Sequence, residues 1–240
     1  MRIALSGYGK MGKAIEKEAL EKGHEVVLKI GSKNINNLIV SELESKEVEV
    51  IIDFSRPESA VDNIKTGLDA GIPVVCGTTG WLEKMDEIKA YCQSQNGTFL
   101  YASNFSIGVN LFFTLNKALA KMMNAHPEYK PYLEEIHHTQ KLDAPSGTGI
   151  TLANDLIQYY DHKTNWVKGE ASKESDLAII SKRIDKVPGT HEIAWTSEID
   201  TIEIKHTAHS RIGFVMGALL AAEWVQGKKG VFGMEDVLSM

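Results

Sequence analysis

The sequence is poor in cysteine, in long apolar runs and in positive charge. Its 240 residues include only two cysteines, Cys76 and Cys92, which are too few for a disulfide framework and too far apart for a C-x-x-C pair. No apolar run approaches the length of a membrane span. Lys and Arg number 26 against 32 Asp and Glu, so the net charge of −6 gives no general attraction to nucleic acid or to an acidic membrane. We therefore expect no nucleic-acid or membrane partner, and a reducing compartment.

The N-terminal residues also lack the features of a secretory signal. Met1 leads into a short apolar stretch and then Gly7, without a long apolar core or a small-residue cleavage site, so the expected location is cytoplasmic. The overall composition, 43% hydrophobic and 24% charged, is ordinary for a chain that buries a core. The length suits one α/β domain with a smaller partner domain.

Short apolar runs alternate with amphipathic stretches in the N-terminal part of the chain. This alternation is typical of a parallel sheet covered by helices and predicts an α/β, Rossmann-type, doubly wound fold. Strands are predicted at 2–6, 25–30, 48–53, 73–76 and 98–101. Helices are predicted at 10–22, 35–43, 57–70 and 82–93. The helix at 35–43 has the weakest pattern because it is short and contains Asn36, Asn37 and Val40.

The pattern changes after Asn104. Helices are predicted at 109–124 and 150–160, with strand-like segments at 132–138, 178–184, 192–196 and 201–205. This order predicts a second domain, α+β in character, built on an open mixed sheet. A last helix is predicted at 213–225.

A glycine-rich motif follows the first predicted strand directly and opens the first predicted helix. Gly7 permits a tight turn, Gly9 lets the backbone approach a pyrophosphate, and Gly12 lets the helix sit close to the strand. The motif predicts a dinucleotide site whose residues are Gly7, Tyr8, Gly9, Lys10, Met11 and Gly12. The alternative is a tight turn without a ligand.

The end of the second predicted strand bears on the choice of cofactor. An NAD site usually has a carboxylate there for the ribose hydroxyls, and this chain has Ser32 and Lys33 instead. A hydroxyl followed by a cation suits the 2′-phosphate of NADPH, so we expect NADPH to be accepted, with or without NADH. The alternative is that Lys33 is a solvated loop lysine.

Two later strand ends carry small hydrogen-bonding residues. Open α/β sheets bind ligands at the carboxyl ends of their strands, so these ends and the glycine motif are expected to outline one crevice. The candidate cofactor residues there are Gly77, Thr78, Thr79, Ala102, Ser103, Asn104 and Phe105. Taken singly, each strand end could be an ordinary turn.

The most informative segment spans residues 134–149. Its end, from Pro145 to Gly149, opens a predicted helix and forms a nest of backbone N–H groups suited to a carboxylate. Upstream lie His137, His138 and Lys141. Alternate residues of a strand share a face, so His138 faces away from its neighbour. If all three side chains reach one ligand, the strand must end near His138.

A metal site is the main chemical alternative for this segment. The potential ligands are His137, His138, His206, His209 and Asp143. Adjacent strand histidines point apart and no recognised ligand spacing is present, so we expect no metal. The plainer alternative is that consecutive histidines are simply surface residues.

The residues from Glu135 to Lys141, followed by Asp143 to Thr148, resemble the hallmark of the dihydrodipicolinate reductase family. The resemblance extends over nearly the whole chain, including the glycine motif, 77–79, 104–110, Gly189 with His191, and 204–211. It implies the NADH- or NADPH-dependent reduction of 4-hydroxy-tetrahydrodipicolinate to tetrahydrodipicolinate in lysine and diaminopimelate biosynthesis. The acidic residue usual between Gly189 and His191 is Thr190 here.

The resemblance also implies residue roles and an assembly. His137 is the implied general acid or base and Lys141 a proton donor, and the dicarboxylate substrate is bound by His138, Ser146, Gly147 and Thr148. The implied assembly is a homotetramer. The helix at 213–225 is expected to return to the first domain. The predicted domains are therefore 1–106 with 212–240 for the dinucleotide, and 107–211 for substrate and oligomerisation.

Two other functions remain open at this point. One is another small Rossmann dehydrogenase of amino-acid metabolism. A semialdehyde enzyme of that kind needs an activated cysteine, and Cys76 follows an apolar strand where we expect it to be buried. The other is a sensor that binds NAD(P) without turnover, which would have no use for the histidines and the lysine beside an anion nest.

Overall fold

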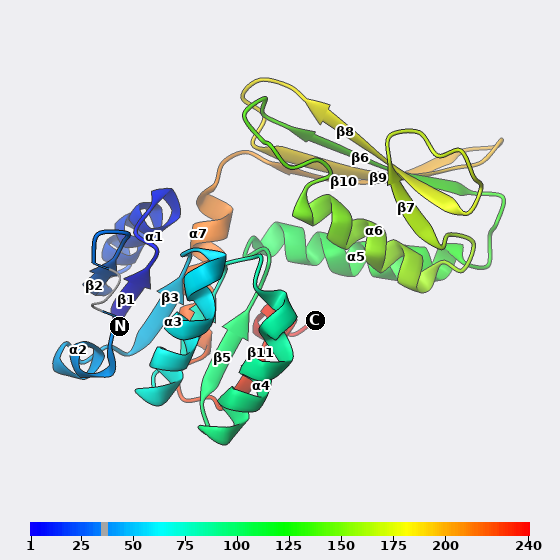
Figure 1. Ribbon diagram of the computed structural model, residues 1–240. Coiled ribbons are helices and arrows are strands. Elements are labelled where there is room, and N and C mark those ends of the chain that lie inside the picture. The colour runs from blue at the N-terminus through cyan, green and yellow to red at the C-terminus, as the bar shows by residue number, and fades with distance from the viewer. Residues whose placement is uncertain (35–37) are drawn as a thin grey trace. The chain divides into compact units, whose positions relative to one another are not determined.

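The computed structural model describes residues 1–34 and 38–240 (Figure 1). The chain divides into two compact units. The first comprises Met1–Ile107 and Ile212–Met240, and the second comprises Gly108–Arg211. Within the described ranges, no helix is both long enough and apolar enough to span a bilayer.

The first unit is built on a six-stranded sheet whose neighbouring strands are all parallel. The strands are β1 (Arg2–Ser6), β2 (Glu25–Ile30), β3 (Val50–Asp53), β4 (Val74–Cys76), β5 (Thr98–Tyr101) and β11 (Gly230–Phe232). Their order is β11-β5-β4-β3-β1-β2, so the chain reverses its direction of progress across the sheet between β1 and β3. Such a switch point is where doubly wound sheets form a ligand crevice.

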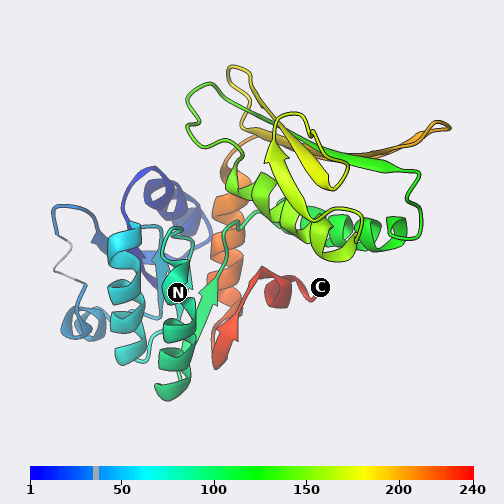
Figure 2. The same ribbon diagram turned by 45° about the vertical axis from the view of Figure 1, so that its right-hand side comes forward.

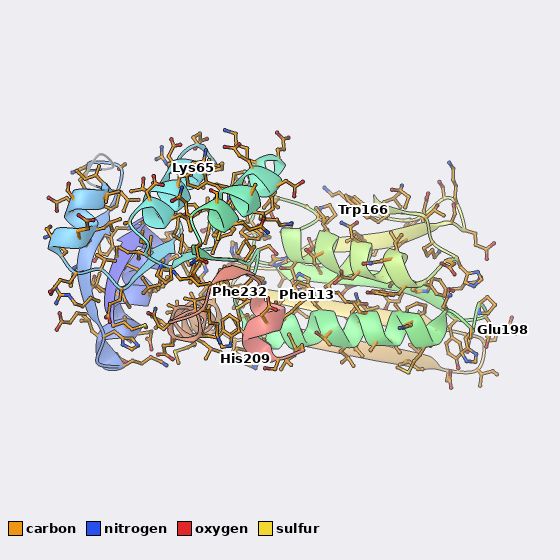
Figure 3. All side chains as sticks on the ribbon, turned by 90° about the horizontal axis from the view of Figure 1, so that it is seen from below. Lys65, Phe113, Trp166, Glu198, His209 and Phe232 are labelled. Atoms are coloured by element: carbon orange, nitrogen blue, oxygen red, sulfur yellow. The ribbon has the colours of Figure 1, made fainter. Side chains whose placement is uncertain are left out.

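Helices cover both faces of this sheet. One face carries α1 (Lys10–Glu21), α7 (Ile212–Trp224) and α8 (Met234–Leu238), and the other carries α2 (Val40–Ser45), α3 (Pro57–Asp69) and α4 (Met85–Ser94). Strand alternation produces two cores: Ile3 and Leu5 of β1 pack in the first, and Ala4 packs in the second. α7, which follows the second unit in the chain, packs in the core of this unit (orange in Figure 2). On the solvent side, Lys65 of α3 pairs with Glu87 of α4 at 2.6 Å (Figure 3 labels Lys65).

The second unit contains a five-stranded mixed sheet in the order β10-β9-β6-β8-β7. Its strands are β6 (Lys130–His137), β7 (Asn165–Lys168), β8 (Asp176–Arg183), β9 (Gly189–Thr196) and β10 (Thr201–Ala208). β6 pairs antiparallel with β9 and parallel with β8. Helices α5 (Ile107–Met123) and α6 (Gly147–Tyr159) pack on one face around Leu133, Ile179 and Trp195. The predicted α/β sheet and the second mixed sheet are thus both confirmed.

The element boundaries differ from prediction in a few places. The predicted helix 82–93 divides into a 3-10 turn, Leu82–Lys84, and α4. The start of the predicted helix 35–43 lies on residues outside the described part of the chain, and α2 begins only at Val40. α6 begins three residues earlier than the predicted Ile150, because the Ser146 side chain caps it by accepting from the Gly149 N–H. The short β7, β11 and α8 were not predicted.

Candidate active site

The glycine motif of the first unit has the geometry that the sequence predicted. Gly7 has φ +90°, and a Cβ there would lie 2.0 Å from the Phe54 carbonyl oxygen. A Cβ at Gly12 would lie 2.6 Å from the Gly7 carbonyl oxygen. A Cβ at Gly9 meets nothing within 4 Å, so no protein contact requires that glycine. Gly9 therefore leaves the start of α1 open to approach, and the binding of a pyrophosphate requires such an opening.

A cavity of about 370 Å³ opens beside this motif at the switch point. Four of the candidate cofactor residues line this cavity: Gly7, Tyr8, Gly9 and Ser32. Residues that the sequence reasoning missed complete the lining: Ile30, Gly31, Phe54, Ser55, Arg56, Ser59 and Asn63, with Ser6. Several of them directly follow β3, so the carboxyl-end argument used for β4 and β5 could have found them.

Buried polar contacts hold the ends of β1, β3 and β4 together beside this cavity. Asp53 is completely buried and accepts from the Thr78 hydroxyl at 2.6 Å and from the Asn63 amide at 3.0 Å. The same amide donates to Ser6 Oγ at 2.9 Å. The Thr78 hydroxyl also accepts from the Ser55 N–H at 2.8 Å, so it serves the protein interior rather than the cavity.

The other candidates of the first unit do not line that cavity. Phe105 is buried in the core and packs edge-to-face on Phe54 at 5.6 Å, and Asn104 accepts from the Ser106 N–H at 2.9 Å. Lys10, Ser103 and Lys33 are exposed. The remaining candidates absent from the lining are Met11, Gly12, Gly77, Thr78, Thr79 and Ala102.

A charged cluster lies beside Tyr8 at the start of α1. The Tyr8 hydroxyl donates to Glu16, which also pairs with Lys29, and the Lys29 ammonium lies 5.4 Å from the centre of the Tyr8 ring. Hydrogen bonding to Glu16 raises the pKa of Tyr8, and the Lys29 contact lowers the pKa of Glu16. Lys29 is thus paired, whereas Lys33 is exposed to solvent.

In the second unit, β6 ends at His137, next to His138, where the sequence required the strand to end if His137, His138 and Lys141 are to reach one ligand. His137 is buried, and its Nδ1 has no hydrogen-bond partner among the residues described. A Cβ at Gly189 would lie 3.2 Å from His137 Nε2, so that glycine leaves room for the imidazole. Burial lowers the pKa of His137, an effect that Lys141 and Arg183 reinforce and Glu135 opposes.

Residues 138–146 link β6 to α6 and carry the lysine predicted to act in catalysis. The Lys141 ammonium lies 2.8 Å from Asp143 Oδ1. Burial alone would raise the pKa of Asp143, but the hydrogen bond and charge of Lys141 hold it below its usual range. At the end of the segment Ser146 is buried as the cap of α6, whereas Gly147 is exposed and a Cβ there would meet nothing within 4 Å. The start of α6 is therefore open to a ligand from the side of Gly147.

Beneath this segment lies a buried cluster that the sequence analysis did not identify. Glu135 is fully buried, and both its carboxylate oxygens accept from the Ser146 N–H at 3.0 and 2.9 Å. His191 Nε2 lies 3.2 Å from Ser146 Oγ, and its ring packs edge-to-face on His137 at 5.0 Å. Burial would raise the pKa of Glu135, but its hydrogen bonds from Ser146 hold it low. Burial lowers the pKa of His191 to about 3, so this imidazole is neutral at pH 7.

Glu135, His137 and His191 could in principle hold a metal, because one ligand atom of each lies within 4.8 Å of the others. Of the ligands considered from the sequence, only His137 belongs to this group. The Ser146 N–H and hydroxyl already occupy the Glu135 carboxylate, and all three side chains are buried. A cation would have to displace those bonds, so the group is better described as a hydrogen-bonded cluster.

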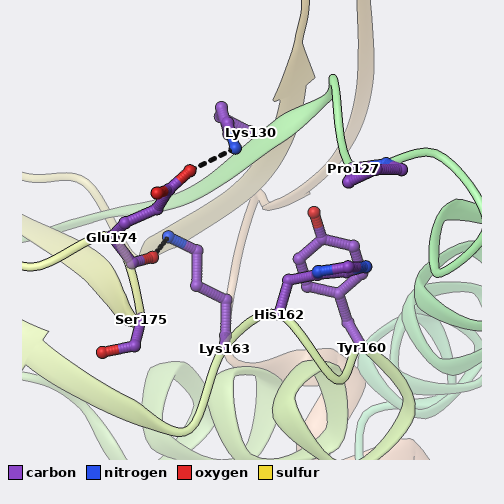
Figure 4. A pocket seen from close by; sticks show the side chains of 7 residues that line it. All are labelled: Pro127, Lys130, Tyr160, His162, Lys163, Glu174 and Ser175. Carbon is purple, nitrogen blue, oxygen red and sulfur yellow. Dashed lines mark hydrogen bonds and ion pairs between the residues drawn. The ribbon is translucent and has the colours of Figure 1, made fainter.

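A cavity of about 300 Å³ lies beside His138 in the second unit and is also lined by Gln140, Lys186, Ser210 and Arg211. It offers an imidazole and two cations to an anionic ligand, against the one opposing charge of Asp185 in the same lining. A second cavity, of about 390 Å³, lies near Lys130 (Figure 4). There Lys130 pairs with Glu174 at 2.6 Å and the Lys163 ammonium donates to the carbonyls of Glu174 and Asp176 at 2.6 and 2.9 Å. Because its cations are already paired, the second cavity is not suited to an anion.

The comparisons with known proteins agree along the whole chain. The family description "Dihydrodipicolinate reductase, N-terminus" matches residues 1–105, and "Dihydrodipicolinate reductase, C-terminus" matches residues 108–238. A 4-hydroxy-tetrahydrodipicolinate reductase of Christiangramia forsetii is 47% identical over 239 residues, covering 100% of this chain and 98% of that protein. One of Clostridium novyi is 33% identical over 250 residues, covering 99% and 98%.

Among solved structures, the dipicolinate-bound dihydrodipicolinate reductase of Paenisporosarcina sp. TG-14 superposes with a TM-score of 0.77. The two chains are 23% identical and each is covered to 98%, so this likeness concerns the fold. The family matches and the two sequence relatives go further, and on their evidence the chain belongs to the dihydrodipicolinate reductase family.

Proposed function

We propose that the chain catalyses the NADH- or NADPH-dependent reduction of 4-hydroxy-tetrahydrodipicolinate to tetrahydrodipicolinate, a step of lysine and diaminopimelate biosynthesis. The observation that carries the proposal is the segment from His137 to Thr148, where a strand end, a lysine and a helix N-terminus follow one another. The family membership and the named relatives support the same reaction.

The proposed cofactor site lies in the first unit, at the switch point between β1 and β3. Its support is the open backbone at Gly9 and the adjoining cavity. When bound there, the dinucleotide supplies the hydride. Ser32 and Lys33 are exposed just after the end of β2, where a 2′-phosphate would find a hydroxyl and a cation in solvent. We extend the proposal to the other candidates named from the sequence, with Thr78 and Phe105 contributing backbone groups only, because their side chains face inward.

In the second unit, we assign substrate binding to His138, Ser146, Gly147 and Thr148. A dianionic substrate on a protein of net charge −6 needs local cations and backbone donors. The N-terminal end of α6 supplies N–H groups and a favourable dipole. The Lys141 ammonium pairs with Asp143 and can turn from that carboxylate toward the bound substrate.

His137 and Lys141 are the proposed proton-transfer residues. Loss of the 4-hydroxyl as water gives a conjugated imine, and hydride addition to that imine leaves negative charge that an acid must quench. Burial lowers the pKa of His137, so its imidazole is largely neutral at pH 7. We therefore assign the proton donation at neutral pH to the Lys141 ammonium. The lysine is then a neutral amine that regains a proton from solvent, and we assign the relay of this proton to the imidazole of His137.

Assembly and location are proposed from the family resemblance. We propose a homotetramer that pairs through the second unit, whose sheet has helices on one face only. On the other face, Lys182 pairs with Glu134 and Lys205 with Glu192, a pattern of charges that a second copy can match. A cytoplasmic location agrees with Cys76 and Cys92, which are both free thiols.

The two rival functions lose support from particular residues. Burial raises the pKa of the Cys76 thiol strongly, so the thiolate that the thioester chemistry of a semialdehyde enzyme needs does not form readily. A sensor without turnover has no need for the ion-paired Lys141 in the segment that leads to the start of α6. A homoserine dehydrogenase and an amine dehydrogenase share the fold at TM-scores of 0.50 and 0.60, but with 12% and 10% identity they say nothing of the reaction.

The test is a coupled assay in which the preceding aldol enzyme generates the substrate and the loss of reduced-nicotinamide absorbance is followed. We expect turnover with NADPH, and NADH is run in parallel to obtain both Michaelis constants. No loss of absorbance with either cofactor at saturating substrate would overturn the proposed function. Light scattering of the same preparation tests the tetramer.

A further inference from the structure

Residues 138–146 lack regular secondary structure and have little apolar anchoring. Leu142, in the middle of the segment, is 97% exposed. A loop without buried apolar side chains samples many conformations unless hydrogen bonds fix its backbone. Because Lys141 lies in this segment, whatever fixes the backbone also fixes the ammonium group.

Arg183, the last residue of β8, supplies contacts of that kind. It lies directly across from His137 in the parallel pairing of β6 with β8. Its Nη2 donates to the carbonyl of Asp143 at 2.5 Å, and its Nε donates to the carbonyl of Lys141 at 3.3 Å. A guanidinium presents several donors in one rigid plane, so a single side chain can hold two carbonyls of the loop at a fixed spacing.

Glu135 fixes the other end of the segment. Its carboxylate accepts from the Ser146 N–H and, at 2.5 Å, from the Ser146 hydroxyl, which in turn accepts from the Gly149 N–H. A Cβ at Gly149 would lie 2.6 Å from Glu135 Oε2, so the glycine makes this approach possible. Arg183 Nη1 lies 3.7 Å from Glu135 Oε1 and links the two anchors electrostatically.

A buried carboxylate with a cation nearby contributes little net stability compared with apolar residues of the same size. The consequence of this pair is therefore geometric. Arg183 determines where the backbone of Lys141 lies, and Glu135 determines where α6 begins.

We propose that Glu135 and Arg183 are positioning residues of this enzyme: Arg183 places Lys141 for proton transfer, and Glu135 places the Ser146 end of α6 for carboxylate binding. The inference rests on the proposed function. Arg183 is expected to affect kcat, because it holds a reacting group. Glu135 is expected to affect KM, because it holds a substrate-binding group.

The test compares Arg183→Gln with Lys130→Gln in the full-length protein. Lys130 is the first residue of the strand that ends at His137, and its ion pair with Glu174 is exposed. Lys130→Gln therefore removes one cation from the same unit, as Arg183→Gln does. For Arg183→Gln we expect kcat to fall by roughly ten- to a hundredfold, as misplacing a reacting group does, with KM within about threefold of wild type. Millimolar guanidinium should restore part of kcat without changing Tm. Lys130→Gln should retain wild-type kcat.

Glu135→Gln tests the other half of the proposal. Its amide has one accepting oxygen where the carboxylate has two, and it carries no charge, so the hydrogen bonds from Ser146 weaken. We therefore expect KM for the substrate to rise by roughly tenfold, with a smaller change in kcat. The dissociation constant of NADPH should be unchanged in every variant, because the cofactor site is built from other residues.

If Arg183→Gln does not fold, Arg183→Lys decides the question, because it keeps the charge and loses the planar set of donors. A folded Arg183 variant with wild-type kcat would overturn the inference. So would a variant whose kcat recovers in guanidinium only together with a rise in Tm, because that recovery would reflect stability and not the position of Lys141. A wild-type protein without turnover would instead overturn the proposed function, so the two failures can be told apart.

Discussion

The two ligand sites proposed for this chain both use the N-terminus of a helix, but the protein holds the two helices in different ways. The start of α1 is shaped by missing side chains: Gly7 turns the backbone and Gly12 lets it pack closely. The start of α6 is shaped by side chains that are present, since Glu135 and Arg183 hold the preceding segment through hydrogen bonds. The shape of the glycine-built site therefore depends on backbone geometry alone. The shape of the site built from buried charged side chains depends on their protonation as well.

The strongest way to test the second site is to remove its proposed proton-transfer groups. We expect His137→Gln and Lys141→Ala each to lower kcat by roughly a hundredfold or more, because each removes a proton-transfer group. The dissociation constant of NADPH, measured by fluorescence titration, should stay close to the wild-type value. Full turnover in both variants is incompatible with the roles assigned here.

The dependence on protonation predicts an acid-labile second unit. Burial gives His191 a pKa of about 3 in the folded state, against about 6.5 in the unfolded chain. Between these values the unfolded chain binds more protons, so stability present above pH 6.5 is lost as the pH falls toward 3. Between pH 7 and pH 5 we expect a loss on the order of 2 kcal/mol from this residue.

Thermal melts of His191→Asn and of His126→Asn measure this effect. His126 is a surface histidine, 57% exposed, in the same unit. The difference in Tm between pH 7 and pH 5 should shrink in His191→Asn, leaving the contributions of His137 and His206, whose pKa values burial also lowers. It should stay at its wild-type size in His126→Asn. Equal pH dependence in all three proteins would show that His191 is not held neutral by burial.

A matched pair of alanine substitutions compares the two helix starts directly. Neither Gly9 nor Gly147 has a positive φ, and a Cβ at either position meets nothing within 4 Å. Both alanine variants should therefore keep the wild-type Tm. We expect Gly9→Ala to weaken NADPH binding by roughly tenfold and Gly147→Ala to raise KM for the substrate by a similar factor, because each Cβ enters the space of an anion.

Isothermal titration with NADPH and a kinetic titration with substrate separate the two effects of this pair. Crossed effects, with Gly147→Ala weakening NADPH binding instead, would break the assignment of one ligand to each helix start. An unchanged pair would mean that neither helix start receives an anion.

The smallest expected effect concerns the choice of cofactor. Lys33 is exposed and Lys29 is paired with Glu16, so only Lys33 of the two is placed to meet a 2′-phosphate. We expect Lys33→Ala to raise KM for NADPH by roughly fivefold, the loss of one exposed charge contact, and to leave KM for NADH unchanged. Parallel kinetics with both cofactors measure this. An equal change for both cofactors would exclude a specific phosphate contact.

The sequence predicted the glycine-built site more completely than the charge-built site. The roles of Gly7 and Gly12 follow from spacing, because a strand, a tight turn and a helix leave few ways to place them. Glu135 was named from the sequence as the first residue of the family hallmark, but without a role. Its burial depends on which face of β6 meets α6, and the alternating burial of that strand is known only once the sheet is formed.

His191 and Arg183 were harder still to predict. They reach the cluster through the antiparallel pairing of β6 with β9 and the parallel pairing with β8, and such long-range pairings leave no local pattern in the sequence. The start of α6 was predicted too late for a related reason. Its cap, Ser146, is itself oriented by Glu135 from eleven residues away.

The most direct test of the account is a crystal structure of the protein with NADPH and pyridine-2,6-dicarboxylate, a stable planar mimic of the substrate. The account predicts a carboxylate of the mimic within hydrogen-bonding distance of the Gly147 and Thr148 N–H groups, with the Lys141 ammonium turned from Asp143 toward the ligand. A mimic bound elsewhere, with Lys141 still paired to Asp143, would contradict it.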